Sequence, residues 1–353
     1  MKWLIPLLVL IPSMLSAEER PPVKAVYINF SPHVIQKTLD LLRATEVNAV
    51  VLNIKNDDGS ISLGQYHKEV IARFKRVGAY VICRLVVFKH SKFRDRNGVI
   101  IIDPAYAVQQ KGGGLWQDYS RNNWLDPGAE VIWRHTVLTA QNGIRAGCNE
   151  INLDYIRFPS PIDGNVFTAV FPATELLRWS DDARKREMIK KFIAYFADNV
   201  KDLPISADVF GYAFANGRET GIGQHMEDFA RAGFILAPMA YPTHFACNDR
   251  LFKVPDPSFV PYEVYDFTSR AGIKYLHDRG LSPPIRPWLQ AFSIRNICFY
   301  TKKGCPNKCG EVEVQYRGNR FREQIRAIEG RGINEWFAWN PNGEYPRDLF
   351  LGK

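Results

Sequence analysis

Two aspartates occupy matching places in two short runs of β-forming residues. Asp154 ends the segment 149–154, and Asp208 ends the segment 204–208. Alternation along each strand puts the aspartate on the opposite face from the large aliphatic side chains. Neighbouring strands lie about 5 Å apart, so the two carboxyl groups can approach the separation of about 5 to 5.5 Å found in retaining glycosidases. The pair predicts two-carboxylate chemistry on a glycosidic bond.

The sequence around each aspartate predicts a different role for it. Arg157 follows Asp154 closely, and we expect its guanidinium to hold that carboxylate ionised, which suits a nucleophile or a stabiliser of positive charge. Asp208 is followed by the apolar segment 209–211, which favours a protonated carboxyl group and hence a general acid. The alternative is structural, because an inward aspartate is often half of an ion pair with an arginine such as Arg84 or Arg157.

Other polar and aromatic residues fall near the ends of the expected strands and are candidates for substrate binding. They are Arg157, Arg84, Asp58, Tyr241, His244, Trp288, Gln290 and Asn340. Tyr241 and Trp288 are the preferred platforms for a sugar ring, whereas most other aromatic residues are interpreted as core.

We expect no cofactor and no metal. The chain has no HxH or HExxH spacing, so His244 is interpreted as a polar groove residue. A metal-dependent hydrolase would need Asp57, Asp58 and His244 to converge at metal distance.

Short β-branched or aromatic runs alternate with helical patterns eight times. The expected strands are 23–30, 49–54, 79–88, 150–154, 204–209, 234–239, 285–292 and 335–339, and the expected helices are 32–44, 65–77, 127–146, 181–202, 223–231, 258–279 and 321–330. Asp126 is predicted to cap the helix that begins at Pro127. Eight such units predict an α/β fold, a (β/α)8 TIM barrel.

Four of the βα connections are long. They span 89–125, 157–180, 241–257 and 293–320. Since these loops open on the functional face of such a barrel, enlarged βα loops predict a deep or long groove.

The N-terminal residues have the pattern of a targeting segment. Residues 1–17 combine Lys2, an apolar run and the small-residue exit Ser16-Ala17, so we expect a signal peptide and one barrel domain over 18–353. No later stretch is long and apolar enough for a transmembrane segment in the mature chain. The expected location is exported, either periplasmic or secreted.

The formal net charge of +9 would attract anionic partners. Nucleic acid is disfavoured, because the cations are scattered without a basic tract and an exported chain rarely meets it.

Six cysteines in an exported chain permit disulfides. Cys83 and Cys148 lie in or beside apolar strands and are interpreted as buried, small apolar residues. Four others lie in loop-like sequence, and two disulfides among them are expected with open connectivity: Cys247, Cys298, Cys305 and Cys309. Zinc at Cys305 and Cys309 is the less favoured alternative, since the CxxC spacing is absent.

Several motifs in a fixed order resemble a glycosyl-hydrolase-like family first catalogued as a bacterial domain of unknown function. The matching stretches run from about residue 23 to 345 and include Leu153-Asp-Tyr-Ile-Arg-Phe-Pro159, Ser206-Ala-Asp-Val-Phe-Gly211, Pro238-Met-Ala-Tyr-Pro242 and Trp336-Phe-Ala-Trp-Asn340. The resemblance implies a barrel related to α-amylase-like enzymes, with the nucleophile at the fourth strand and the acid at the fifth.

The chain departs from the family pattern in two places. It has Asn53-Ile-Lys-Asn56 where family members usually show Asp-x-Lys-Asp, and it carries a cysteine-bearing insertion at 298–309.

The sequence thus predicts an exported glycoside hydrolase acting on an envelope or extracellular polysaccharide. Asp154 is the expected nucleophile or stabiliser, and Asp208 the expected general acid and base. The alternative is a non-catalytic, glycan-binding TIM barrel of the cell envelope, because a fold does not by itself decide function.

Overall fold

The computed structural model describes residues 20–94, 102–216, 220–249, 251–295, 313–314 and 318–351. The expected signal peptide lies outside the described residues, as do Cys298, Cys305 and Cys309.

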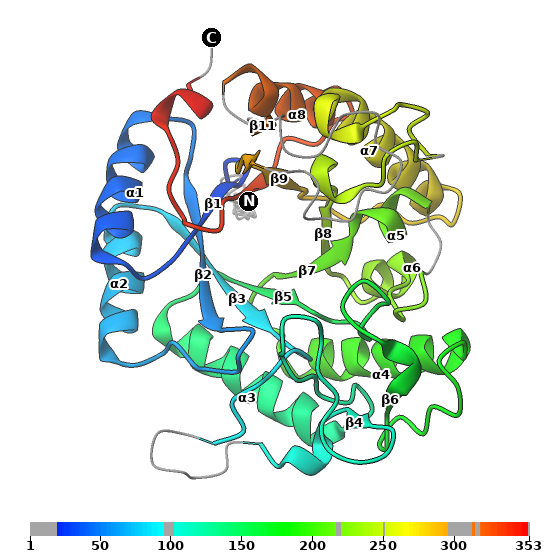
Figure 1. Cartoon of the computed structure of the whole chain (residues 1–353). Coiled ribbons are helices and arrows are strands. Elements are labelled where there is room, and N and C mark those ends of the chain that lie inside the picture. Colours follow the sequence, from blue (N-terminus) through cyan, green and yellow to red (C-terminus); the bar gives the residue numbers. More distant parts are fainter. Residues whose placement is uncertain are drawn as a thin grey trace, which may run out of the picture.

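The predicted (β/α)8 TIM barrel is confirmed. Eight parallel strands close in the order β1-β12-β9-β8-β7-β5-β3-β2, with β12 pairing to β1 (Figure 1). The strands are β1 (Lys24–Ile28), β2 (Ala49–Lys55), β3 (Tyr80–Val86), β5 (Glu150–Asp154), β7 (Ile205–Phe210), β8 (Ile235–Met239), β9 (Trp288–Gln290) and β12 (Trp336–Trp339). Closure makes β3, β5 and β7 consecutive neighbours, so residues far apart in the sequence meet inside the barrel.

Helices surround the strands on the outside of the barrel (Figure 1). They are α1 (Pro32–Ala44), α2 (Gln65–Arg76), α3 (Glu130–Ala146), α4 (Asp182–Asn199), α5 (Gly211–Asn216), α6 (Met226–Arg231), α7 (Pro261–His277) and α8 (Asn319–Glu329). The short helix α5 was not predicted. It packs against α7 where Gly272 offers no side chain, since a Cβ there would collide with the Phe214 ring.

Alternation along the strands separates two apolar layers. On β2, Ala49 and Val51 belong to a cluster inside the barrel, whereas Val50 and Leu52 belong to the larger core between strands and helices. On β5 the outer core takes the aliphatic residues 151 and 153. The intervening polar residues of β5 therefore face the barrel interior, as the period of two predicts.

Two local expectations are wrong. The seventh strand is shorter than predicted, Trp288–Gln290 in place of 285–292, and it begins directly after Pro287, which has no N–H to donate to the sheet. Asp126 does not cap α3, whose N-cap is Ala129. Its buried carboxyl group accepts the amide of Gly128 at 2.9 Å in the turn before α3, and it also accepts Ala173 N at 2.7 Å and the Thr174 amide and hydroxyl, so it joins two long loops.

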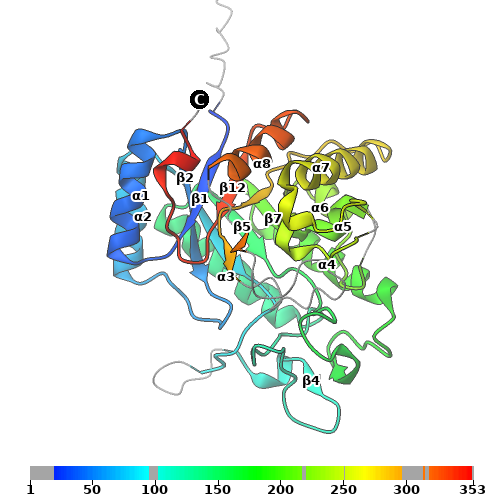
Figure 2. The same cartoon turned by 45° about the horizontal axis from the view of Figure 1, so that its top comes forward.

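The long loops after β3 and β5 form one structure. Strands β4 (Gln109–Gln110) and β6 (Ala169–Val170) pair as a small antiparallel sheet between them. Figure 2 shows the segment around β4 projecting from the barrel, at the bottom of the view and far from the C-terminus. A second small sheet joins β10 (Ile294–Arg295) to β11 (Glu313–Val314). These small sheets lie in connections that follow the carboxyl ends of the barrel strands.

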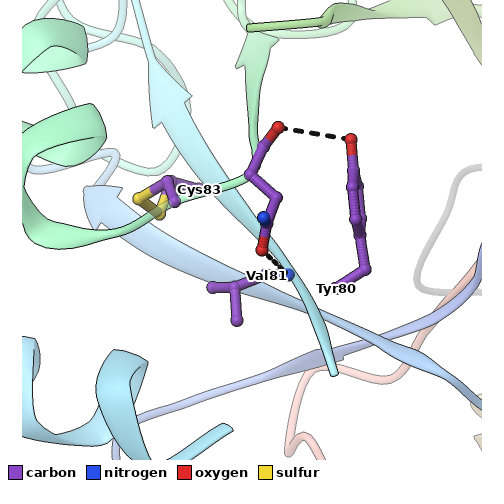
Figure 3. Close-up of a disulfide and its surroundings, with 5 residues drawn as sticks. Tyr80, Val81 and Cys83 are labelled. Atoms are coloured by element: carbon purple, nitrogen blue, oxygen red, sulfur yellow. Dashed lines mark hydrogen bonds between the residues drawn. A yellow bond between two sulfur atoms is a disulfide. The ribbon is translucent and has the colours of Figure 1, made fainter. Parts of the chain in front are cut away.

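Cys83 and Cys148 are buried, as expected, but they also form a disulfide (Figure 3), which the sequence interpretation had not assigned to them. They are 65 positions apart in sequence, but their Cα atoms are 5.8 Å apart because β3 and β5 are neighbours. The next residue, Asn149, accepts the Val81 amide at 3.0 Å and the Tyr80 hydroxyl at 3.3 Å. Cys247 is also in a disulfide, as expected for the loop cysteines. The disulfide and Asn149 together fix β3 to the start of β5.

The double substitution Cys83→Ala with Cys148→Ala is expected to lower the free energy of unfolding by about 2 to 5 kcal/mol, because the link closes a long loop in the unfolded chain. Urea unfolding of both proteins, without reductant, measures the difference. Equal midpoints and slopes would show that strand pairing alone holds β3 against β5.

Candidate active site

A cavity of about 440 Å³ opens among the carboxyl ends of the barrel strands. Both predicted catalytic aspartates, Asp154 and Asp208, line it. Five of the predicted binding residues also line it: Arg84, Arg157, Tyr241, His244 and Trp288. The cavity thus gathers side chains from strands that are distant in the sequence.

Asp154 is held at the last position of β5 by both of its oxygens. Oδ1 accepts the amide of Tyr155 at 2.6 Å, and Oδ2 forms an ion pair with Arg84. Tyr155 has a φ of 55°, a left-handed conformation that is uncommon for a residue with a side chain. The chain turns at this residue, directly after the last residue of β5. A backbone outlier of this kind is frequent at functional sites.

Asp208 lies on β7 and is almost completely buried. Its Oδ1 accepts hydrogen bonds from Asn152 Nδ2 at 2.8 Å and from Trp288 Nε1 at 2.6 Å. Burial, followed by repulsion from Asp154, raises the pKa of Asp208 to about 8, although Arg84 and the two donors act in the opposite direction. A carboxyl group with such a pKa is protonated at neutral pH and can donate a proton.

Arg84 joins the two carboxylates. Its Nη2 contacts Asp154, and its Nε lies 3.7 Å from Oδ2 of Asp208. Its remaining nitrogen, Nη1, donates to Oδ1 of Asn53 at 2.9 Å. Because both carboxyl groups contact one guanidinium, they lie less than about 10 Å apart, which is the upper limit for direct two-carboxylate glycosidase chemistry.

The predicted pairing of Arg157 with Asp154 is wrong. Arg157 donates instead to Asp163 at 2.7 Å and 3.2 Å, and its guanidinium stacks 4.4 Å from the ring centre of Phe210. Asp163 lies in the same loop after β5, where Ser160 also donates to it at 2.7 Å and 2.8 Å. Arg157 therefore fixes the loop after β5. The ion pair with Asp154 that was predicted for Arg157 is formed by Arg84 on the neighbouring strand.

Aromatic rings form the wall of the cavity. The ring centres of Tyr241 and Trp339 are 5.2 Å apart and tilted by 32°, and Phe292, which does not line the cavity itself, packs behind them at 4.9 Å from Trp339. His244 packs edge-on against Tyr241 at 5.0 Å. Such rings offer flat apolar faces to a sugar ring.

Three of the predicted binding residues do not line the cavity. Asp58 forms an ion pair with Lys92 and accepts Ser60 N at 2.8 Å, Gln290 accepts the Thr243 hydroxyl at 3.0 Å, and Asn340 donates to the backbone of Glu344 at 2.8 Å. Burial raises the pKa of Asp58, but hydrogen bonds from Lys92 and Ser60 outweigh it and lower the pKa to about 2. All three side chains serve the local structure of loops and turns.

The structure adds residues that the sequence did not single out as site residues. Tyr27, Asn53, Asp163 and Tyr212 line the cavity. The alternation along β1 and β2 could have identified Tyr27 and Asn53 as residues that face the barrel interior. Asp163 and Tyr212 lie in a loop and a short helix, where no periodic pattern indicates which way a side chain faces. In the part of the chain that the structure describes, no group of three or more His, Cys, Asp or Glu residues is arranged to hold a metal.

The fold and cavity define a TIM barrel of the kind that glycoside hydrolases use. Similar solved structures include a class V chitinase from Pseudomonas fluorescens Pf-5, with 10% identity, a TM-score of 0.58 and coverage of 93% of this chain and 97% of that one. The catalytic domain of a β-amylase from Paenibacillus polymyxa has 13% identity and a TM-score of 0.55, with 94% of this chain and 95% of that one covered. The Bacillus cereus spore cortex-lytic enzyme SleL has 12% identity and a TM-score of 0.52, with 93% of this chain and 72% of that one covered. At these identities the likeness concerns the fold.

A family model described as "Putative glycosyl hydrolase domain" matches residues 25–345. The chain belongs to this family, which confirms the resemblance found in its sequence. No curated protein sequence matches it significantly. Among the helices of the described ranges, none has the length and apolar character needed to cross a membrane.

Proposed function

We propose that this chain is an exported glycoside hydrolase that cleaves a polysaccharide with Asp154 and Asp208. The observation that supports the proposal most is the shared contact with Arg84, together with the burial of Asp208. One carboxylate is paired with a cation, while the other is driven to hold a proton at neutral pH. Two carboxyl groups whose surroundings differ in this way are typical of an acid and its nucleophilic partner.

In the proposed reaction, Asp208 gives its proton to the glycosidic oxygen as the bond from that oxygen to the anomeric carbon breaks. Asp154 attacks the anomeric carbon and forms a covalent glycosyl ester. Asp208, now ionised, takes a proton from a water molecule that attacks the same carbon. The ester bond breaks, the sugar leaves, and both side chains return to their first state.

The aromatic wall is the proposed binding surface for the sugar. Trp288 lies on β9, Trp339 on β12 and Tyr241 just after β8, and all three line the cavity together with Asp208. Arg84 is assigned to the carboxylates rather than to substrate, because all its nitrogens are already in contact with protein groups. The substrate class proposed is a carbohydrate chain of the envelope or the extracellular space.

Export is supported by the disulfide between Cys83 and Cys148, because disulfides persist in oxidising compartments. The signal peptide proposed for residues 1–17 agrees with this location, and one barrel domain is proposed for residues 18–353. The net charge of +9 would hold such a protein near an anionic envelope.

Incubation of the protein lacking residues 1–17 with envelope, capsular and extracellular polysaccharides is expected to release reducing ends from at least one of them. The rate should fall as the pH rises through about 8, because Asp208 loses the proton that it must donate. Asp154→Asn is the control for contaminating activity. Binding to a polysaccharide without release of reducing ends from any of them would favour the non-catalytic, glycan-binding barrel.

A further inference from the structure

A chain of hydrogen bonds runs through the barrel interior beneath Asp208. Glu150, fully buried on β5, accepts Arg286 Nη1 at 2.7 Å and 2.8 Å, and it accepts the hydroxyl of Ser206 at 2.7 Å. A carboxylate paired with arginine can only accept hydrogen bonds. The single hydroxyl hydrogen of Ser206 is therefore directed at Glu150.

This direction fixes the side-chain amide of Asn152. Ser206 Oγ, with its hydrogen already used, can only accept from Asn152 Nδ2, which lies 3.1 Å away. The second hydrogen of Nδ2 then points to Asp208 Oδ1 at 2.8 Å. The carbonyl oxygen of Asn152 is buried and has no hydrogen-bond partner among the described residues. In this orientation both amide hydrogens have acceptors, in Ser206 and Asp208.

Trp288 approaches the same oxygen of Asp208 from β9. Its indole Nε1 lies 2.6 Å from Oδ1, and an indole N–H can only donate. Oδ1 thus receives two N–H donors and has no place for the carboxyl hydrogen. Oδ2 has a longer contact of 3.7 Å to Arg84 Nε, beyond hydrogen-bond length.

We propose that Asn152 and Trp288 are positioning residues that confine the transferable proton of Asp208 to Oδ2, with Ser206 and Glu150 setting the direction of the Asn152 amide. The inference rests on the proposed role of Asp208 as the acid, and it specifies which oxygen performs it. A proton held on one oxygen in one orientation needs no rearrangement before transfer.

The test is a carboxyl-carbon NMR titration of the protein labelled with ¹³C aspartate, in which the Asp208 signal is assigned by its loss in Asp208→Asn. Trp288→Phe and Asn152→Leu each keep the approximate shape and remove a donor. Each is expected to move the Asp208 midpoint upward by about 1 pH unit, because a donor to the carboxylate favours its ionised form. Ser206→Ala should move it in the same direction, and Ser206→Thr, which keeps the hydroxyl, should restore it.

The matched control is Trp336→Phe on β12. Its indole N–H is buried and has no partner in the described part of the chain, so its loss is expected to leave the Asp208 midpoint unchanged. Unchanged midpoints in folded Trp288→Phe and Asn152→Leu would overturn the proposal. Circular dichroism checks that each variant is folded. If one of the two is not, the proposal is tested by the other together with Ser206→Ala and Ser206→Thr. Since the titration uses no substrate, its result is independent of whether the protein hydrolyses any glycan.

Discussion

Asp154→Asn is expected to lower kcat/KM for polysaccharide cleavage by at least about 1,000-fold, because the amide cannot form the glycosyl ester that splits the reaction into two steps. The neutral amide remains nearly isosteric beside Arg84, so the barrel should stay folded. Release of reducing ends from the polysaccharide identified in the screen measures the loss.

Asp154→Ala extends this experiment, since it leaves room for an external nucleophile. Added azide should restore part of the turnover of this variant and yield a glycosyl azide. The control for Asp154→Asn is Asp278→Asn, which makes the same chemical change at an exposed residue just beyond α7. This variant should retain full activity. Wild-type rates in Asp154→Asn would rule out the assigned nucleophile.

Arg84→Met is expected to lower the free energy of unfolding by about 3 kcal/mol or more at pH 8, because it leaves two buried carboxyl groups without their common cation. The loss should be smaller at pH 5. The folded-state pKa of Asp208 is raised above its unfolded value, so its contribution to stability is full below about pH 4 and is lost as the pH rises through about 8. Arg84 opposes the upward shift of the Asp208 pKa. Its removal should therefore make the loss of free energy of unfolding at alkaline pH greater. Urea unfolding at both pH values measures the difference.

Two comparisons separate this effect from a general loss of packing. Arg84→Met combined with Asp154→Asn should be less destabilised than Arg84→Met alone, since the second change removes the unpaired charge. Arg331→Met breaks a partly exposed ion pair with Asp266 and should cost at most about 1 kcal/mol at either pH. A loss for Arg84→Met that is equal at pH 5 and pH 8 would contradict an electrostatic role for this residue.

Much of the fold follows from patterns that are local in the sequence. The fourth barrel strand and the first helix begin and end where the sequence predicted, at 150–154 and 32–44, because alternation and helical spacing depend only on near neighbours. The same alternation predicted that Asp154 and Asp208 lie opposite the aliphatic side chains, and both line the cavity. The catalytic candidates could be found for that reason, before any tertiary contact was known.

Local patterns misjudged residues whose surroundings come from another part of the chain. Asp126 precedes a proline and a helix, which is typical of a cap, yet its closest donors are the Ala173 amide and the Thr174 hydroxyl in the loop after β5. Gln290 follows strand alternation, but the Thr243 hydroxyl engages it away from the cavity. In each case the nearest partner in space is distant in the sequence.

The sequence by itself determined the barrel, the strands that carry Asp154 and Asp208, and the membership in a glycosyl hydrolase family. Only the tertiary structure decided that Arg84, rather than Arg157, contacts both aspartates, and that Cys83 is linked to Cys148. The physical reason is barrel closure. It makes β3, β5 and β7 neighbours, so that side chains more than 50 positions apart in the sequence meet the same partner within a few ångströms.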